Sequence, residues 1–149
     1  MNKIEMYFSK KEDEFIELFP IMVGFERCEP LHKTPRSFYN YHLLHYVSSG
    51  TGTLKIGGKS HPVKSGEIFI IPKNTFSEYV ADKNEPWEYV WIALVGKMAD
   101  KLSTLPPVLP FGDDAFESMK KSIKIGVKSV EKYLSYAYSI YYELLGESN

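Results

Sequence analysis

Four histidines, His32, His42, His45 and His61, are the side chains of this sequence best suited to holding a metal ion. A transition-metal site needs two or three imidazoles and a carboxylate close together. No His-x-His pair occurs, and His42 and His45 lie three residues apart in an expected strand, so their side chains point to opposite faces. The histidine spacing therefore predicts no metal site.

The sequence also contains no arrangement of residues that supports covalent catalysis. Cys28 is the single cysteine, so it forms no disulfide within the chain. No Ser-His-Asp or reactive-cysteine arrangement can be assembled, and the glycines of GTGTLKIGG precede a strand, whereas a phosphate-binding loop precedes a helix. We expect a binding protein that is not an enzyme and that has no cofactor.

Aromatic residues are unusually abundant, with 11 Tyr, 9 Phe and 2 Trp making up 15% of the chain. Each ring supplies a large apolar surface, and Tyr and Trp add a polar group. Hydrophobic cores and pockets for polar ligands both use such residues, so composition alone leaves both open.

Length and charge narrow the class of protein. A chain of 149 residues with 44% hydrophobic residues suits one domain. The 18 basic and 19 acidic residues give a net charge of -1, whereas nucleic-acid-binding domains usually carry a basic surplus. No leader peptide is recognisable and the longest apolar run, residues 68–72, is too short for a bilayer. We expect a soluble, cytoplasmic protein that contacts neither nucleic acid nor membrane through these residues.

Short apolar segments separated by turn residues dominate residues 19–96. They recur about every ten residues without an intervening helix, which is typical of a β-barrel or sandwich. We expect a loop at residues 29–37, because it contains two prolines, and a two-residue hairpin turn at Gly57-Gly58. The expected strands are 19–28, 39–47, 53–56, 59–63, 67–71, 75–80 and 87–95.

The two ends of the chain differ from this middle. Residues 1–18 are expected to form an arm of limited order, with a helical turn or two at 12–18. Beyond residue 96 helix formers appear, with Asp113 as a helix cap. In the last helix one stripe of apolar residues repeats at helical spacing: Val127, Val130, Leu134, Ala137, Tyr141 and Leu144. This stripe either packs on the barrel or pairs with a second copy of the chain.

Residues 36–96 resemble the N-terminal cupin-like domain of AraC/XylS-type transcription regulators. The matching segments are RSFYNYHLLHYVSSGTGTL, GGKSHPVKSGEIFIIPKN and SEYVADKNEPWEYVWIALVG, of which the P-W-x-Y-x-W run in the last is the most diagnostic. Roughly sixty of 149 residues carry the resemblance. It implies a mainly β fold, a cupin-like jelly-roll barrel followed by two or three helices.

The resemblance also implies a division of the chain and a function. Residues 1–18 are the arm, 19–96 the barrel and 97–149 the helical dimerisation segment. In the family the barrel binds a small effector, often a sugar, the helices form a homodimer, and a separate C-terminal domain binds DNA. No recognition-helix pattern occurs before Asn149, so we expect this chain to lack that domain.

Two other functions remain as alternatives. The first is a metal-dependent cupin enzyme, but Leu43 stands where the first metal motif would place its Glu, and Thr75, Phe76 and Ser77 stand where the second would place its His. The second alternative is a dimerisation module whose barrel holds no ligand.

The expected binding residues lie on facing strands. Alternation puts Tyr89 and Trp91 on one face of strand 87–95, and the resemblance selects that face as the cavity wall. Trp91 would stack on a sugar, while Tyr89 and Tyr79 would bond its hydroxyls. The opposite wall would hold Tyr41, Leu43 and His45, and Arg36 would lie at the entrance, where a guanidinium can bind paired hydroxyls or a carboxylate. Each of these residues has a plainer alternative as a core side chain or a solvated charge.

Overall fold

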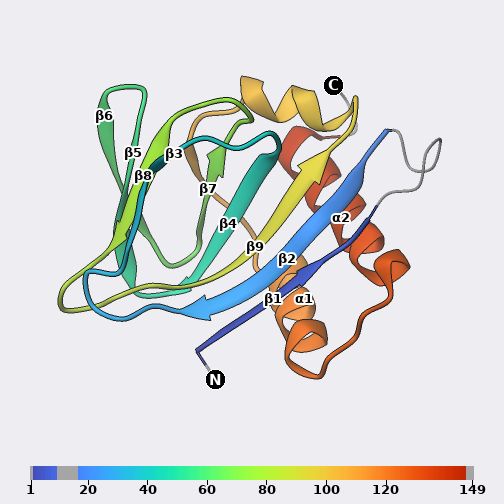
Figure 1. Ribbon diagram of the computed structural model, residues 1–149, viewed down its shortest axis with the longest axis horizontal. Helices are drawn as coiled ribbons and strands as arrows, with labels where there is room; N and C mark the ends of the chain where they lie inside the picture. The colour runs from blue at the N-terminus through green and yellow to red at the C-terminus, as the bar shows by residue number, and fades with distance from the viewer. Residues whose placement is uncertain (1, 10–16, 147–149) are drawn as a thin grey trace.

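Two antiparallel sheets face each other in the structure, a computed structural model that describes residues 2–9 and 17–146 (Figure 1). The larger sheet has the order β1-β2-β9-β4-β7-β10 and the smaller one β3-β8-β5-β6. The strands of the larger sheet are β1 (Lys3–Tyr7), β2 (Phe19–Arg27), β9 (Glu88–Val95), β4 (His42–Ser49), β7 (Glu67–Ile71) and β10 (Val108–Pro110). The smaller sheet contains β3 (Lys33–Ser37), β8 (Ser77–Ala81), β5 (Thr51–Ile56) and β6 (Lys59–Lys64).

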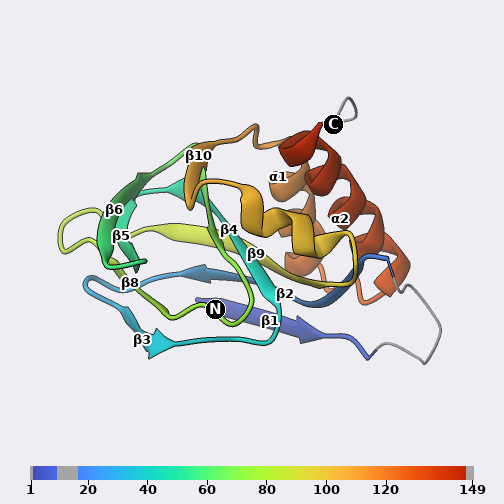
Figure 2. The same cartoon turned by 90° about the horizontal axis from the view of Figure 1, so that it is seen from above.

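Helical segments cover the outer face of the larger sheet, as seen from above in Figure 2. They are the 3-10 helix η1 (Ala99–Thr104) and the α-helices α1 (Asp114–Lys124) and α2 (Val130–Leu145). The molecule is therefore layered as small sheet, interior, large sheet and helices. The expectation of a mainly β fold followed by two or three helices is confirmed. None of the helices among the described residues has the length and hydropathy needed to cross a bilayer.

Alternation along β9 creates two separate cores. Val90, Ile92 and Leu94 pack outward against the helices, in one cluster of buried residues. Tyr89 and Trp91 belong to a second cluster, which lies between the sheets. Because successive side chains in a strand point to opposite faces, this single strand serves both cores.

Three strands were not predicted from the sequence: β1, β3 and the three-residue β10, which pairs with β7. The first is β1, which pairs with β2 along its whole length, so limited order is wrong for Lys3–Tyr7. The helical turn expected at 12–18 lies largely outside the described residues. The second is β3, within the expected loop 29–37, which pairs with β8 despite Pro35. An edge strand tolerates proline, and the β3–β8 register shifts just beyond Thr34.

The apolar stripe expected for dimerisation does not stay on one face of α2. Val127 precedes the helix, which begins at Val130. Ala137 and Tyr141 are buried and pack, with Tyr133 and Ile140, in the core shared with the large sheet. A helix has 3.6 residues per turn, so its buried face drifts away from a strict 3,4 spacing. The remaining members of the stripe, Val130, Leu134 and Leu144, are half-buried.

Candidate ligand-binding site

The inward residues of neighbouring strands form a row across the large sheet. Trp91 on β9 is paired with Gly24 on β2 and, on its other side, with His45 on β4. His45 is in turn paired with Phe69 on β7. Hydrogen-bonded register thus places an indole, an imidazole and a phenyl ring side by side on the inner wall.

Gly24 makes room for the Trp91 ring. A Cβ atom built at Gly24 would lie 2.1 Å from Cζ2 of the indole, a distance that no real contact allows. The ring therefore lies across the backbone of β2, toward β1. The sequence contains a signal for this contact, since a glycine inside a strand often marks a close approach of another group.

A hollow of about 260 Å³ lies beside these rings, between the two sheets, and is partly open to solvent. Six of the seven expected binding residues line it, from the loop before β4 and from β4, β8 and β9: Tyr41, Leu43, His45, Tyr79, Tyr89 and Trp91. The expectation that Leu43 and His45 lie on the wall opposite Trp91 is wrong, because β4 and β9 are neighbouring strands of the large sheet. Strand β1 adds Lys3, Glu5 and Tyr7 to the rim, which the sequence analysis did not foresee. The cavity is therefore built by residues from both sheets and the N-terminal strand.

Arg36 does not join this set. Its guanidinium carbon lies 4.0 Å above the ring of exposed Phe76, and it lines a separate groove of about 570 Å³ around the β5–β6 turn. Thr34 does line the cavity, but the register shift between Thr34 and Ser37 interrupts the alternation that would carry Arg36 to the same face. We favour the smaller cavity as the binding site, because aromatic walls and converging polar groups meet there.

His45 is a neutral, incompletely bonded group in the cavity wall. Its side chain is fully buried, and this burial lowers its pKa to about 3. The imidazole stacks on Phe69 at 4.4 Å and meets the edge of Tyr89 at 4.6 Å. Nδ1 has no hydrogen-bond partner among the described residues. A ligand hydroxyl would remove the cost of that unpaired nitrogen.

The tyrosines of the cavity also stay uncharged. Burial raises the pKa of Tyr41 to about 12, and it raises the pKa values of Tyr79 and Tyr89 further. Each phenol therefore remains an O–H group that donates or accepts a hydrogen bond. The inner wall consequently suits a neutral polar ligand better than an ion.

The deep half of the barrel is filled. Trp87 is fully buried, and its ring stacks on Phe69 at 5.1 Å. A Cβ at Gly52 would lie 2.3 Å from the Trp87 ring, so the indole also packs against the backbone of β5. In the part of the barrel that the structure describes, the cavity lies at the end nearer β1.

The comparison with protein families is decisive for this chain. Residues 19–113, well over half of it, match the family described as the AraC-like ligand binding domain. The chain belongs to this family. The resemblance to this family is therefore confirmed, and the match covers every strand that lines the cavity except β1.

Curated relatives point in the same direction. The chain is 29% identical over 79 residues to the Msm operon regulatory protein of Streptococcus mutans serotype c, covering 53% of this chain and 28% of that one. It is 36% identical over 76 residues to the raffinose operon transcriptional regulatory protein RafR of Pediococcus pentosaceus, covering 48% and 27%. The chain thus matches little more than a quarter of the length of these regulators.

Solved structures confirm the cupin-like fold. The protein YhaK from Escherichia coli aligns with a TM-score of 0.59 at 14% identity, over 74% of this chain and 50% of that one. The cupin domain of Schizosaccharomyces pombe Cnp3 aligns with a TM-score of 0.51 at 10% identity, over 70% and 72%. At such low identity these structures support the fold alone.

Proposed function

We propose that the cavity binds a small neutral polar effector, a sugar, and that this domain thereby controls DNA binding by a longer transcription regulator in the cytoplasm. The observation that carries the proposal is the partly open cavity, walled by Trp91 and by uncharged hydroxyl and imidazole groups. A sugar ring presents C–H groups that stack on an indole and hydroxyls that need hydrogen bonds.

The size of the cavity and the relatives favour the same class of ligand. A hollow of about 260 Å³ lies just below the range of about 300–1,000 Å³ typical of drug-sized ligands, so one sugar ring suits it. The raffinose regulator, and the lactose operon transcription activator of Staphylococcus xylosus, which is 32% identical over 68 residues, carry sugars in their names. These names support a sugar as the class of ligand, but they do not identify the sugar.

Strand β1 is the part of the proposed arm, residues 1–18, that would respond to a ligand bound in the cavity. Lys3, Glu5 and Tyr7 line the cavity rim, so a ligand there contacts β1 directly. A ligand shifts a conformational equilibrium only through different affinities for the two states. Contacts with β1 supply such a difference, because they exist only when the strand is docked on β2.

A thermal-shift screen with mono-, di- and trisaccharides tests the proposal. A ligand that binds only the folded state stabilises it by RT ln(1 + [L]/Kd), so a cognate sugar raises the melting temperature in a concentration-dependent way. The Trp91→Ala variant should lose this shift at the same sugar concentrations. A complete panel without any shift would instead favour the barrel as a dimerisation module, and turnover of a sugar would favour an enzyme.

We also propose a homodimer formed through the exposed side of α2. The half-buried residues Val130, Leu134 and Leu144 leave apolar surface there, flanked by Tyr142, which is 44% exposed. Leu134→Asp should convert a dimer to a monomer in analytical ultracentrifugation, because a carboxylate in an apolar interface is costly. Ser60→Asp, at an exposed position of β6 in the smaller sheet, is the matched control and should leave the dimer intact. A wild-type domain that sediments as a monomer at high concentration would refute this interface.

A further inference from the structure

Three side chains of the types that bind transition metals meet near the cavity rim. They are the carboxylate of Glu26, the thiol of Cys28 and the imidazole of His32, and one ligand atom from each lies within 4.8 Å of the other two. His32 Nε2 lies 3.7 Å from Glu26 Oε2. We propose that these residues bind a divalent metal ion of the zinc type.

The distances suit such an ion. Bonds of about 2.0–2.3 Å in tetrahedral geometry place neighbouring ligand atoms about 3.3–3.8 Å apart. The separation of the imidazole and the carboxylate already falls in that range, and the thiol needs a movement of about 1 Å or less. Lys3, which lies opposite Glu26 in the strand register, pairs with Glu5 at 3.7 Å. Within residues 2–9 and 17–146, the ion-pair partner of the Glu26 carboxylate is His32 and not Lys3.

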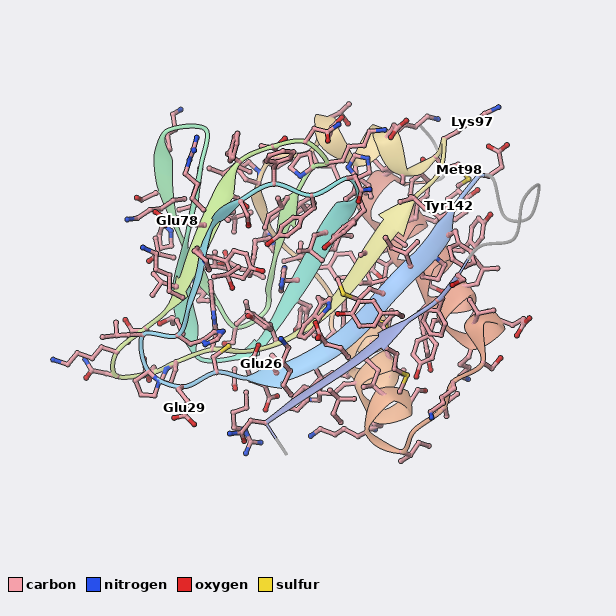
Figure 3. The ribbon with its side chains drawn as sticks, in the orientation of Figure 1. Glu26, Glu29, Glu78, Lys97, Met98 and Tyr142 are labelled. Atoms are coloured by element: carbon pink, nitrogen blue, oxygen red, sulfur yellow. The ribbon has the colours of Figure 1, made fainter. Side chains whose placement is uncertain are left out.

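The backbone holds the three ligands from two sides. Glu26 and Cys28 are two residues apart at the end of β2, so their side chains share the inward face. The Cys28 N–H donates to the carbonyl of Trp87 at 3.1 Å. On the other side of the turn, the His32 carbonyl accepts from the Ala81 N–H at 2.9 Å. Figure 3 shows Glu26 near the end of β2 and Glu29 in the turn that follows.

The donor types select the class of metal. Thiolate and imidazole favour zinc and its neighbours, whereas magnesium and calcium prefer oxygen ligands only. Burial raises the pKa of the Cys28 thiol to about 12, so metal binding must release the thiol proton to solvent. The resulting thiolate and the Glu26 carboxylate together balance the charge of a dication. Cys28 is only 4% exposed, but the His32 side chain is 39% exposed, so an ion enters from the His32 side.

A three-residue site leaves the fourth position of a tetrahedral ion open. Glu26 and His32 both line the cavity, so this position is adjacent to the space proposed for the effector. Water, or an oxygen atom of the effector, would complete the coordination. An effector bound in the cavity would then contact the ion, and the ion would connect the effector to the turn between β2 and β3.

This inference revises the expectation that the chain holds no metal. That expectation rested on the positions of the usual cupin ligands, around Leu43 and Thr75, and on the spacing of the histidines alone. The pattern Glu-x-Cys-x3-His lies outside those positions, at the end of β2 and in the turn that follows it. The three side chains form a cluster because the turn after β2 brings His32 back toward that strand.

Cobalt(II) is a direct probe, since it takes zinc sites and absorbs light. Titration of the metal-free chain, without any sugar, should produce a saturable thiolate-to-cobalt charge-transfer band at one ion per chain. Zinc should abolish the band by competition. Because no effector is added, the outcome is independent of the proposed sugar binding.

Three variants assign the ligands. His32→Gln, Glu26→Gln and Cys28→Ser should each weaken zinc binding more than about 100-fold, since even partners of metal ligands contribute about 10–100-fold. His61→Gln, on β6 in the other sheet, is the matched control and should bind as wild type. The His32 variant changes a partly exposed side chain, so it should fold even where Cys28→Ser does not. Absence of the band in wild type, or unchanged zinc affinity in His32→Gln, would overturn the proposal.

Discussion

The two faces of β9 show how one strand can serve stability on one side and binding on the other. Outward, Val90, Ile92 and Leu94 are completely buried between the sheet and the helices, in a layer of mainly apolar side chains. Inward, Tyr89 and Trp91 are also almost fully buried, but their neighbours are rings that carry hydroxyl groups and an imidazole.

The two faces of β9 differ in the empty space and the unpaired polar atoms beside them. A sealed aliphatic layer gains its stability from dispersion and from the removal of apolar surface from water. The inner face contains a hollow and the Nδ1 atom of His45, which has no partner among the residues that the structure describes, and both features cost stability. Features that cost stability without a structural benefit are expected at functional sites.

The largest expected effects come from substituting one residue on each face of β9. Trp91→Ala should weaken binding of a cognate sugar by about 30-fold or more, the effect of losing a contact worth about 2 kcal/mol, while the domain remains folded. Ile92→Ala should instead lower the free energy of unfolding by about 2–5 kcal/mol and leave the sugar affinity unchanged. Calorimetry and chemical denaturation measure the two quantities. A Trp91 variant with wild-type affinity would remove this residue from the site.

A smaller effect is expected from Gly24→Ala. The added methyl group overlaps the Trp91 indole, so the ring must shift or the strand must move. We expect a loss of stability of about 1–3 kcal/mol together with weaker sugar binding. Gly58→Ala is a useful comparison, because nothing lies within 4 Å of a Cβ there and only its positive φ of 74° opposes the change. Unaltered sugar affinity in the Gly24 variant would show that the position of the indole is unimportant.

The smallest effect, counted per pH unit, concerns acid stability. Burial lowers the pKa of His45 from 6.5 to about 3, so between these pH values the unfolded chain binds a proton that the folded chain does not. The free energy of unfolding should therefore fall as pH decreases from about 6.5 toward 3, with His45 contributing up to about 1.4 kcal/mol per pH unit. His45→Phe should flatten this part of the profile in denaturation experiments. An unchanged slope would mean that His45 is protonated in the folded protein.

The sequence predicted those parts of the molecule that depend on local alternation. The faces of β4 and β9 follow from period-two spacing, and with the family resemblance they identified six of the seven cavity residues that had been expected. Leu43, His45, Tyr89 and Trp91 sit in the eight-residue strands β4 and β9, where a position in the sequence determines the face.

The parts that could not be predicted depend on pairing between distant segments. Arg36 was expected at the entrance, but the register shift in β3 is a property of its pairing with β8. The rim residues of β1 could not be predicted, because they reach the cavity only through the pairing of β1 with β2. Likewise, which side of α2 is buried depends on the sheet beneath it, since the apolar residues of this helix occupy more than one face.

The indole signals of the folded domain test the central claim most directly, because the chain has two tryptophans and both lie in the inner core. In a nitrogen-proton NMR spectrum, assigned with Trp91→Phe, a sugar that raises the melting temperature should shift the Trp91 indole N–H saturably and leave the methyl groups of Val90, Ile92 and Leu94 almost unmoved. A stabilising sugar that leaves the Trp91 signal in place, or that shifts the outer methyl groups instead, would contradict a binding site inside the barrel.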